Sequence, residues 1–337
     1  MLTQRKEYIL SIIIAEYIHT GLPVSSDTVA RKGLGVSSAT IRNDMNELEE
    51  FGYLSQPHTS AGRIPSDKGY RHYIGSLMGD ARLSLADQFM IRHQFHQVRR
   101  EVEQWTHLAA AILSSMVHNV AIVTLPKPYE PRLKHVELVS LQEFLALLIL
   151  ILKEARLKQH VLTLENATTQ EELSTIAQKI NSAFSGLNSS EISTNDMQFS
   201  VTEEQIVKSV IQLLQSEEEE PYEDPYIDGL RHILNQPEFS SNNKLAAVIE
   251  LFEQKRLLKS LLPQVLTEDG VQVFIGGENE QDIMRDFSVI ISKYGIPGEV
   301  SGAIGVIGPT RIQYNRAIPT VYFLSSVMSE LLSELYR

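Results

Sequence analysis

Apolar positions near the start of the chain recur at helical spacing. Ile9, Ile12, Ile13 and Tyr17 form one stripe along a first helix, which stops before the turn at residues 21–23. An apolar stripe of this width has to pack against other elements. The pattern therefore predicts an amphipathic helix at the start of a small helical domain.

A second helix and a third helix are predicted next, joined by a glycine-rich turn. Ser25 or Ser26 can cap the short second helix, and residues 33–36 then form a tight turn of the kind that a helix-turn-helix needs. Ser37 is a natural N-cap for a third helix over residues 38–51, which a glycine ends.

The third helix has two faces of different chemistry. Ile41, Met45 and Leu48 fall on one side and are expected to dock on the first two helices. The opposite side carries small and polar residues in its first turns, which are Ala39, Arg42, Asn43 and Asn46. Because the positive end of the helix dipole lies at the same end as these side chains, this half of the helix is predicted to enter a DNA groove.

A short hairpin is predicted directly after this helix. Residues 53–56 read as a strand, residues 57–63 as a polar turn and residues 64–65 as the returning strand, before a helical stretch over 67–77. A hairpin in this position is a wing, which can contact phosphate or the minor groove. A plain three-helix bundle with a hairpin has the same periodicity, so the pattern alone leaves DNA binding open.

Residues 36–73 contain a longer motif that narrows the choice. Its first part, S-x-A-T-I-R-x-x-M-x-x-L, is shared by several winged-helix regulators, including sugar-responsive repressors. Its continuation through P-H-T-S-A-G-R-x-P is more specific. The whole segment closely resembles the signature of HrcA, a family of bacterial heat-inducible transcription repressors. The stretches F-I-G-G-E-N at 274–279 and G-A-I-G-V-I-G-P-T-R-I-Q-Y-N-R-A-I-P-T-V at 302–321 resemble the same family.

Along residues 80–337 the predicted secondary structure changes twice, from helices to strands and, after a helical block, to strands again. Residues 80–117 are helical in pattern and include Trp105, which is expected in a core or an interface. Strands are predicted on both sides of an acidic helical block at 165–237, which suggests one sheet domain interrupted by an insertion. The strand segments are 120–125, 134–140, 144–152 and 160–164 before the block, and 271–275, 288–292 and 301–309 after it. Further helices are expected at 244–262 and within 314–335.

The resemblance implies an α+β protein of three domains. Residues 1–78 would be the winged helix-turn-helix DNA-binding domain. Residues 79–164 and 238–337 would form a GAF-like antiparallel sheet domain with linking helices, and residues 165–237 an inserted, mainly helical dimerising domain.

Charge and composition limit the class of protein. The net charge is −12, but residues 1–78 hold eight Lys/Arg and eight Asp/Glu, so the excess acid lies outside the predicted DNA-binding domain. The chain has no cysteine, which excludes disulfides, zinc–thiolate sites and cysteine nucleophiles. The charged N-terminus is not a signal peptide, and the apolar run at 144–152 is too short to span a membrane. We expect a cytoplasmic protein without a membrane partner.

Other candidate sites were weak. The glycines at 276–277 and 302–308 match no phosphate-binding loop and are expected to be closely packed strand glycines. His93 and His96 lack a third metal ligand, and the acid run at 217–220 is expected to be a solvated loop. We therefore expect no catalytic residue, no metal and no cofactor, and a protein that is not an enzyme.

DNA contacts are expected from eight residues, five on the recognition helix and three on the wing: Ser38, Thr40, Arg42, Asn43, Asn46, His58, Thr59 and Arg63. The resemblance implies a homodimer that represses class I heat-shock (chaperone) operons through the double-stranded inverted repeat CIRCE. It also implies that a GroEL-type chaperonin modulates this activity. The alternative is a metabolite-sensing winged-helix regulator with a GAF-like ligand pocket. A structural or enzymatic protein with an incidental winged helix is a third reading.

Overall fold

The computed structural model divides into two compact units. The first comprises residues 1–126, 224–296 and 302–337, and the second comprises residues 127–223 and 297–301. The residues that the structure describes are 2–58, 61–77, 82–99, 101–128, 130–153, 157–219, 225–234, 236–239, 270–279 and 284–336. The helix expected at 244–262 and the wing residue Thr59 lie outside these ranges.

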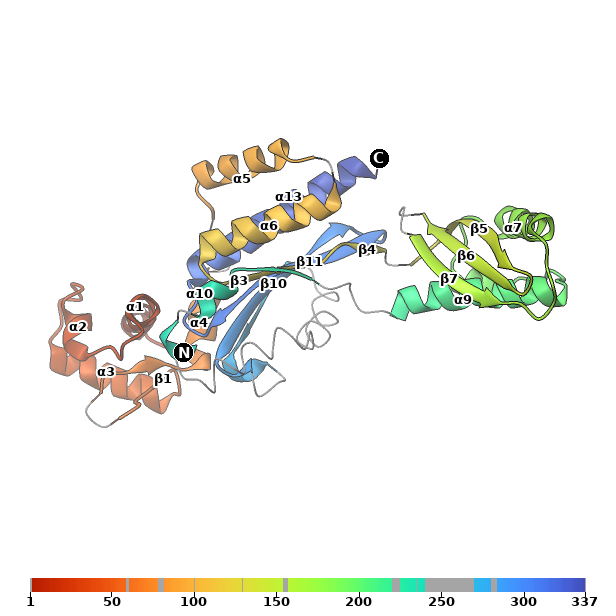
Figure 1. Ribbon diagram of the computed structural model, residues 1–337. Coiled ribbons are helices and arrows are strands. Elements are labelled where there is room, and N and C mark those ends of the chain that lie inside the picture. The colour runs from red at the N-terminus through yellow and green to blue at the C-terminus, as the bar shows by residue number, and fades with distance from the viewer. Residues whose placement is uncertain are drawn as a thin grey trace. The chain divides into compact units, whose positions relative to one another are not determined.

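The N-terminal part of the first unit consists of three helices, a hairpin and a fourth helix (Figure 1). Its elements are α1 (Gln4–Thr20), α2 (Ser26–Ala30), α3 (Ser38–Glu50), β1 (Leu54–Ser55), β2 (Ile64–Pro65) and α4 (Asp67–Leu77). Thr3, Ser25 and Ser37 cap α1, α2 and α3, each accepting a hydrogen bond from the backbone of the third residue beyond it. The predicted order of helices and hairpin is confirmed.

The core of this helix-turn-helix domain uses the predicted faces of α1 and α3. Ile9 and Ile13 of α1 are fully buried with Ile41 and Leu48 of α3, and Met45 is 3% exposed. Burial of apolar side chains at this level contributes roughly 1.5–3 kcal/mol per residue. The opposite face of α3 is thereby left at the surface.

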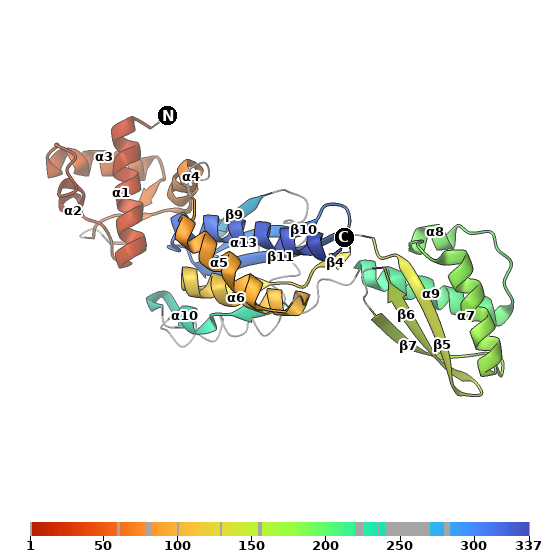
Figure 2. The same cartoon turned by 90° about the horizontal axis from the view of Figure 1, so that it is seen from above.

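The rest of the first unit is an antiparallel sheet covered by helices. In the described residues the sheet has six strands: five run in the order β8-β3-β11-β10-β9, and β4 (Lys127–Pro128) pairs with the start of β11. Figures 1 and 2 show α6 and α13 side by side on this sheet, with α5 beside them. The elements are α5 (Leu85–Gln97), α6 (Val102–Val117), β3 (Val120–Val123), β8 (Tyr226–Asp228), α10 (Leu230–Leu234), η1 (Pro237–Phe239), β9 (Val271–Ile275), η2 (Gly276–Glu278), β10 (Phe287–Ile296), β11 (Val300–Pro309) and α13 (Tyr314–Leu335).

Strand β11 contains glycines because neighbouring groups approach it closely. A β-carbon on Gly302 would lie 2.6 Å from the ring of Tyr294, and one on Gly305 would lie 2.8 Å from a backbone oxygen of β10. Such distances leave no room for a side chain. The expectation that these are packing glycines rather than a nucleotide-binding loop is confirmed. Trp105 is 2% exposed and lies in the core formed by the covering helices.

The second unit has its own three-stranded antiparallel sheet. Strand β6 pairs with β5 on one side and β7 on the other, and α7 packs against β5. The elements are β4 (Lys127–Pro128), β5 (Leu133–Gln142), β6 (Leu145–Leu152), β7 (Leu157–Thr163), α7 (Gln170–Phe184), α8 (Ser189–Ser193) and α9 (Val201–Glu219).

The sheet membership of these strands differs from the sequence interpretation, which assigned residues 79–164, with the strands predicted at 134–140, 144–152 and 160–164, to the interrupted sheet domain. Strands β5, β6 and β7 pair with one another in a sheet separate from the main one, and their buried sides share a core with α7 and α9. The helical segment is therefore part of a larger compact unit that begins at residue 127. The residue pattern shows where strands occur but not which strands pair with one another.

The acid run at 217–220 was expected to be a solvated loop, and this expectation is wrong for Glu217. Helix α9 continues through Glu219, and Glu217 is 1% exposed. It lies one and two turns beyond Leu214 and Val210, on the face of α9 that packs into the core. Its carboxylate forms an ion pair of 2.7 Å with the Lys158 Nζ of β7. A buried charge is tolerated here because it is paired.

Candidate nucleic-acid interface

The exposed face of α3 carries the three polar residues that were expected to read bases. Arg42, Asn43 and Asn46 are all exposed, on the side opposite the buried Ile41 and Leu48. Arg42 and Asn43 lie in the second turn of the helix and Asn46 in the third, beyond the first turn where the positive end of the dipole acts. Guanidinium and carboxamide groups at this position can form bidentate hydrogen bonds with purine edges.

Ser38 and Thr40 have hydroxyls that are engaged within the protein. The Ser38 Oγ donates to the Asp27 Oδ1 at 2.5 Å and lies 2.9 Å from the Ser26 Oγ. The Thr40 hydroxyl lies 3.0 Å from the Ser37 Oγ at the start of the helix. The contacts of Ser38 join α2 to the first turn of α3, whereas the contact of Thr40 lies within the N-terminal cap of α3.

Arg63 packs against the recognition helix. Its Nη2 donates to the Asn46 Oδ1 at 2.8 Å and forms an ion pair of 2.8 Å with Glu49. The side chain is only 13% exposed, and its Nε is buried without a hydrogen-bond partner. The base of the wing is thereby fastened to α3. Sequence reasoning missed this link because Arg63 and Asn46 are 17 residues apart.

The wing is also fastened to the turn between α1 and α2. The backbones of Arg63 and Val24 exchange two hydrogen bonds of 2.9 Å. A β-carbon on Gly62 would lie 2.3 Å from the Val24 carbonyl oxygen, so only glycine fits beside this bridge. His58 lies at the exposed turn of the wing. Arg63 therefore connects the hairpin both to α3 and to the turn that precedes α2.

An ion pair between the buried Asp44 of α3 and the half-exposed Arg5 of α1 was not predicted. Asp44 is 3% exposed on the apolar face of α3 and accepts hydrogen bonds from the Arg5 Nε at 2.8 Å and Nη2 at 2.9 Å. The hydrogen bonds to Asp44 raise the pKa of Arg5. Asp44 falls between Ile41 and Leu48 in helical periodicity, so a carboxylate on an apolar face was the available signal.

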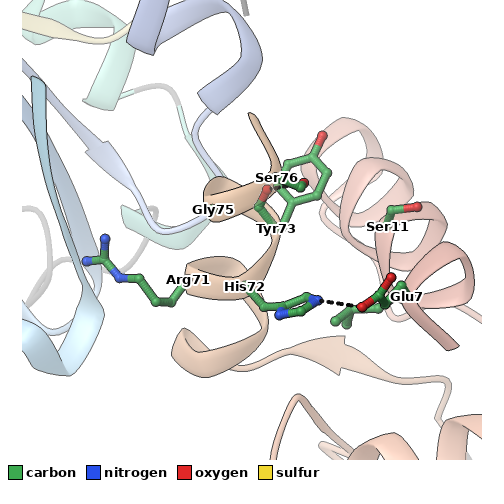
Figure 3. Close-up of a pocket in the computed structure, with 8 residues that line it drawn as sticks. Glu7, Ser11, Arg71, His72, Tyr73, Gly75 and Ser76 are labelled. Atoms are coloured by element: carbon green, nitrogen blue, oxygen red, sulfur yellow. Dashed lines mark hydrogen bonds and ion pairs between the residues drawn. The ribbon is translucent and has the colours of Figure 1, made fainter. Parts of the chain in front are cut away.

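A hollow of about 450 Å³ lies between α1 and α4 (Figure 3). Its lining includes Glu7 and His72, whose Oε1 and Nε2 are 4.0 Å apart, and Ser11 and Ser76. None of the eight residues expected to contact DNA lines it. Among the residues that the structure describes, no cluster of three or more potential metal ligands is present. No helix in the described part of the chain is long and apolar enough to cross a membrane.

Comparisons with known families match both parts of the chain. Residues 14–66 match the DeoR-like helix-turn-helix domain, and residues 103–318 match the HrcA protein C terminal domain. The second match covers more than half of the chain.

Curated relatives match over the full length. A heat-inducible transcription repressor HrcA of Dehalococcoides mccartyi is 45% identical over 337 residues, covering 100% of this chain and 97% of the relative. The repressor of the same name from Herpetosiphon aurantiacus is 45% identical over 342 residues, covering 99% and 96%. That from Chloroflexus aurantiacus is 41% identical over 354 residues, covering 100% and 95%.

A solved structure of similar fold is among the matches. It is a crystal structure of a hypothetical protein, 24% identical, with a TM-score of 0.62 over 99% of this chain and 98% of the other.

Proposed function

This chain belongs to the HrcA family of heat-inducible transcription repressors, and we propose that it represses class I heat-shock (chaperone) operons by binding the CIRCE inverted repeat as a homodimer. It is a transcription repressor with a helix-turn-helix DNA-binding domain and not an enzyme. One observation carries the operator proposal: Arg42, Asn43 and Asn46 are exposed together in the second and third turns of α3.

On this proposal the three exposed residues contact different groups on the DNA. Arg42 would contact a guanine edge or a phosphate, and Asn43 would contact an adenine edge. Asn46 accepts from Arg63 through its Oδ1, which leaves its Nδ2 to donate to an acceptor on DNA. His58, Thr59 and Arg63 would contact the backbone or the minor groove from the wing. Ser38 and Thr40 would support the helix start and can still approach phosphate.

The homodimer is supported by an apolar sheet face in the second unit. Along β6 the residues alternate between buried and half-buried, and the half-buried set is Leu145, Leu147, Ile149 and Ile151. Leu147 pairs with Val139 of β5 and Val161 of β7, which are 36% and 49% exposed. A contiguous apolar face is typical of a protein interface, and an inverted repeat calls for a two-fold partner. We therefore assign this face to a second copy of the chain.

The proposal includes a GroEL-type chaperonin that keeps the repressor active, as the family resemblance implies. Exposed apolar side chains support it, because chaperonins bind such groups. Leu85 and Phe89 of α5 are 72% and 73% exposed. We also place the activity in the cytoplasm, where an operon is transcribed.

A competition titration tests the operator proposal. The chain is titrated with a CIRCE duplex and with a scrambled duplex at several salt concentrations. We expect specific binding at least ~10³-fold tighter than binding to scrambled DNA. Asn43→Ala and Arg42→Ala should each weaken specific binding by about tenfold. Glu50→Ala, an exposed change at the far end of the same helix, is the matched control and should have no effect.

Two results would count against this assignment. Equal affinity for both duplexes would exclude operator recognition. Binding that responds to a small molecule but not to added chaperonin would favour the metabolite-sensing regulator instead.

A further inference from the structure

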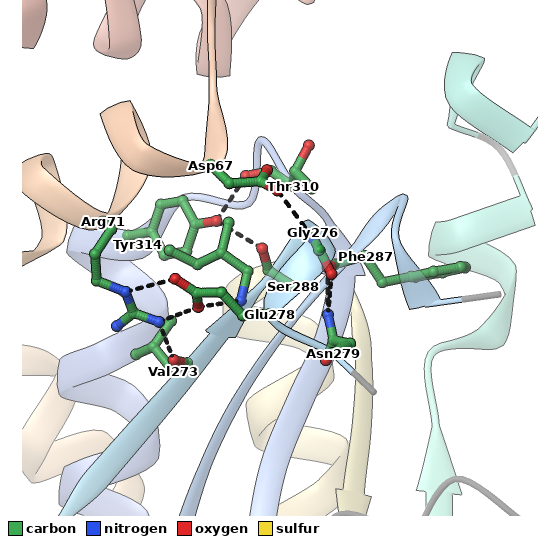
Figure 4. Close-up of polar contacts among 12 residues, drawn as sticks. Asp67, Arg71, Val273, Gly276, Glu278, Asn279, Phe287, Ser288, Thr310 and Tyr314 are labelled. Atoms are coloured by element: carbon green, nitrogen blue, oxygen red, sulfur yellow. Dashed lines mark hydrogen bonds and ion pairs between the residues drawn. The ribbon is translucent and has the colours of Figure 1, made fainter. Parts of the chain in front are cut away.

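Three segments that lie far apart in the chain meet where the helix-turn-helix domain contacts the main sheet (Figure 4). They are residues 65–73, 274–279 and 308–316, each within a stretch that resembles the HrcA family. The second and third segments contain none of the residues proposed to contact DNA. We call the contact of Asp67 and Arg71 with residues 276–278 the α4 clasp.

The first part of the α4 clasp is the contact of the Asp67 carboxylate with the turn at Gly276 and Gly277. The Asp67 Oδ2 accepts a hydrogen bond of 2.9 Å from the Gly277 backbone. Gly276 has a φ of +50°, and a β-carbon on it would lie 2.4 Å from the Asp67 Oδ1. The close approach of the carboxylate therefore requires the glycine. The contact with Asp67 explains why residues 276 and 277 are glycines, although neither is among the residues proposed to contact DNA.

The second half of the α4 clasp is an arginine with three acceptors. The Arg71 Nε donates to the Glu278 Oε1 at 3.0 Å, and its Nη2 donates to the Val273 carbonyl at 2.6 Å and to the Glu278 Oε2. The Glu278 Oε2 also accepts from the Ile275 backbone at 2.9 Å. Both partners of the ion pair are thus fixed by backbone groups of β9, which makes the contact directional.

A second contact holds the end of α1. Arg311 forms a bidentate pair with Glu238, with one hydrogen bond of 3.0 Å, and donates to the Gln236 Oε1 at 3.1 Å. Its Nη1 is 3.4 Å from the Ile18 carbonyl oxygen near the end of α1. The hydrogen bond to Glu238 raises the pKa of Arg311. The sheet part of the first unit therefore contacts both α1 and α4.

Helix α4 is in turn attached to the end of the recognition helix. The Lys68 Nζ donates to the Phe51 carbonyl at 2.7 Å, and the Ser66 Oγ donates to the Gly52 carbonyl at 2.6 Å. A β-carbon on Gly69 would lie 2.3 Å from the Tyr53 carbonyl oxygen. A rotation of α4 would therefore carry α3 with it.

We propose that Asp67, Arg71 and Glu278 are positioning residues for operator binding: the α4 clasp fixes the orientation of the helix-turn-helix domain on the sheet. The inference rests on the proposed binding of an inverted repeat by a dimer. Two recognition helices must reach half-sites with a set spacing. Domains held in that orientation bind the second half-site at a high effective concentration, whereas freely rotating domains do not. The clasp then contributes to binding of the whole repeat and not to binding of one half-site.

The test compares two duplexes of equal length, one with the full inverted repeat and one with a single half-site, using the full-length chain. Arg71→Ala and Asp67→Ala should each lower affinity for the full repeat by about tenfold, with half-site affinity unchanged within about twofold. Asp67→Asn keeps an acceptor for the Gly277 amide and should restore most of the loss. Arg92→Ala removes an exposed pair with Glu330 inside the sheet part and is the matched control.

Hydrogen exchange of the Gly277 amide gives a readout independent of DNA. It should be faster in the Asp67→Ala chain than in the parent and recover in Asp67→Asn. An unchanged ratio of full-repeat to half-site affinity in both alanine variants would overturn the positioning role, as would a gain in full-repeat affinity. If the parent does not distinguish the repeat from scrambled DNA, the proposed function fails and the positioning role fails with it. The hydrogen-exchange rate of the Gly277 amide would in that case still show whether Asp67 contacts Gly277.

Discussion

At the scale of single residues, the most informative position is Glu217, a buried carboxylate whose environment the sequence did not reveal. Its ion pair with Lys158 joins α9 to β7. Lys158 is partly exposed, but removing it leaves the buried Glu217 carboxylate without its cationic partner. We expect Lys158→Met to lower the free energy of unfolding by about 3 kcal/mol, measured by urea denaturation. The double variant Lys158→Met/Glu217→Leu should recover most of that loss. A stable Lys158→Met chain would show that the pair contributes little.

Residue roles were predictable where they follow from periodicity alone. The exposed positions of Arg42 and Asn43 follow from the apolar stripe of α3, which fixes the opposite face. The contact of Arg63 with Asn46 and Glu49 could not be predicted, because the path of the wing decides it. Asp44 lies between these cases. Its place on an apolar face indicated that the carboxylate has an ion-pair partner, but not that the partner is Arg5.

At the scale of elements, the start of α9 shows how a cap can make stability depend on pH. The Glu203 carboxylate accepts from the Lys179 Nζ at 2.9 Å and from the Ser200 backbone at 2.8 Å. These hydrogen bonds, chiefly that from Lys179, lower the pKa of Glu203 below its ordinary value of 4.5. A lowered pKa in the folded state means that the stabilisation is complete above pH 4.5. It is lost as the pH falls through the folded-state pKa.

We therefore expect Glu203→Gln to destabilise the chain at pH 7 by up to about 1 kcal/mol, because Lys179 is partly exposed. The difference from the parent should shrink as the pH falls below 4.5. Urea denaturation at neutral and acidic pH measures this, with Glu204→Gln on the same turn as the exposed control. A difference that is constant with pH would exclude the carboxylate as its source.

The elements themselves were well predicted, but their partners were not. The strand predicted at 144–152 matches β6, and the strand predicted at 271–275 matches β9. The half-buried side of β6 was not predicted, because a continuous apolar run is typical of a strand buried on both faces. The assignment of β5 and β6 to a sheet depends on hydrogen bonds between strands, which carry no sequence signature. The same holds for η2, whose glycines are explained by Asp67, a residue 210 positions away.

At the scale of the whole molecule, the apolar face of β5, β6 and β7 links oligomeric state to operator binding. A charge at its centre would have to be buried without a partner if two copies met there, which is strongly unfavourable. We expect Leu147→Glu to convert a dimer of about twice 38.0 kDa into a chain of 38.0 kDa, measured by sedimentation over a range of concentrations. The folded monomer should keep its half-site affinity and lose the advantage of the full repeat.

The control for this change is Val201→Glu, because Val201 is 60% exposed at the start of α9 rather than on the sheet face. It should leave both mass and operator affinity unchanged. A Leu147→Glu chain that stays dimeric would assign the dimer to another surface. The distinction also separates two causes of weak operator binding. Loss of the dimer changes the mass, whereas loss of the α4 clasp lowers full-repeat affinity in a chain that is still dimeric.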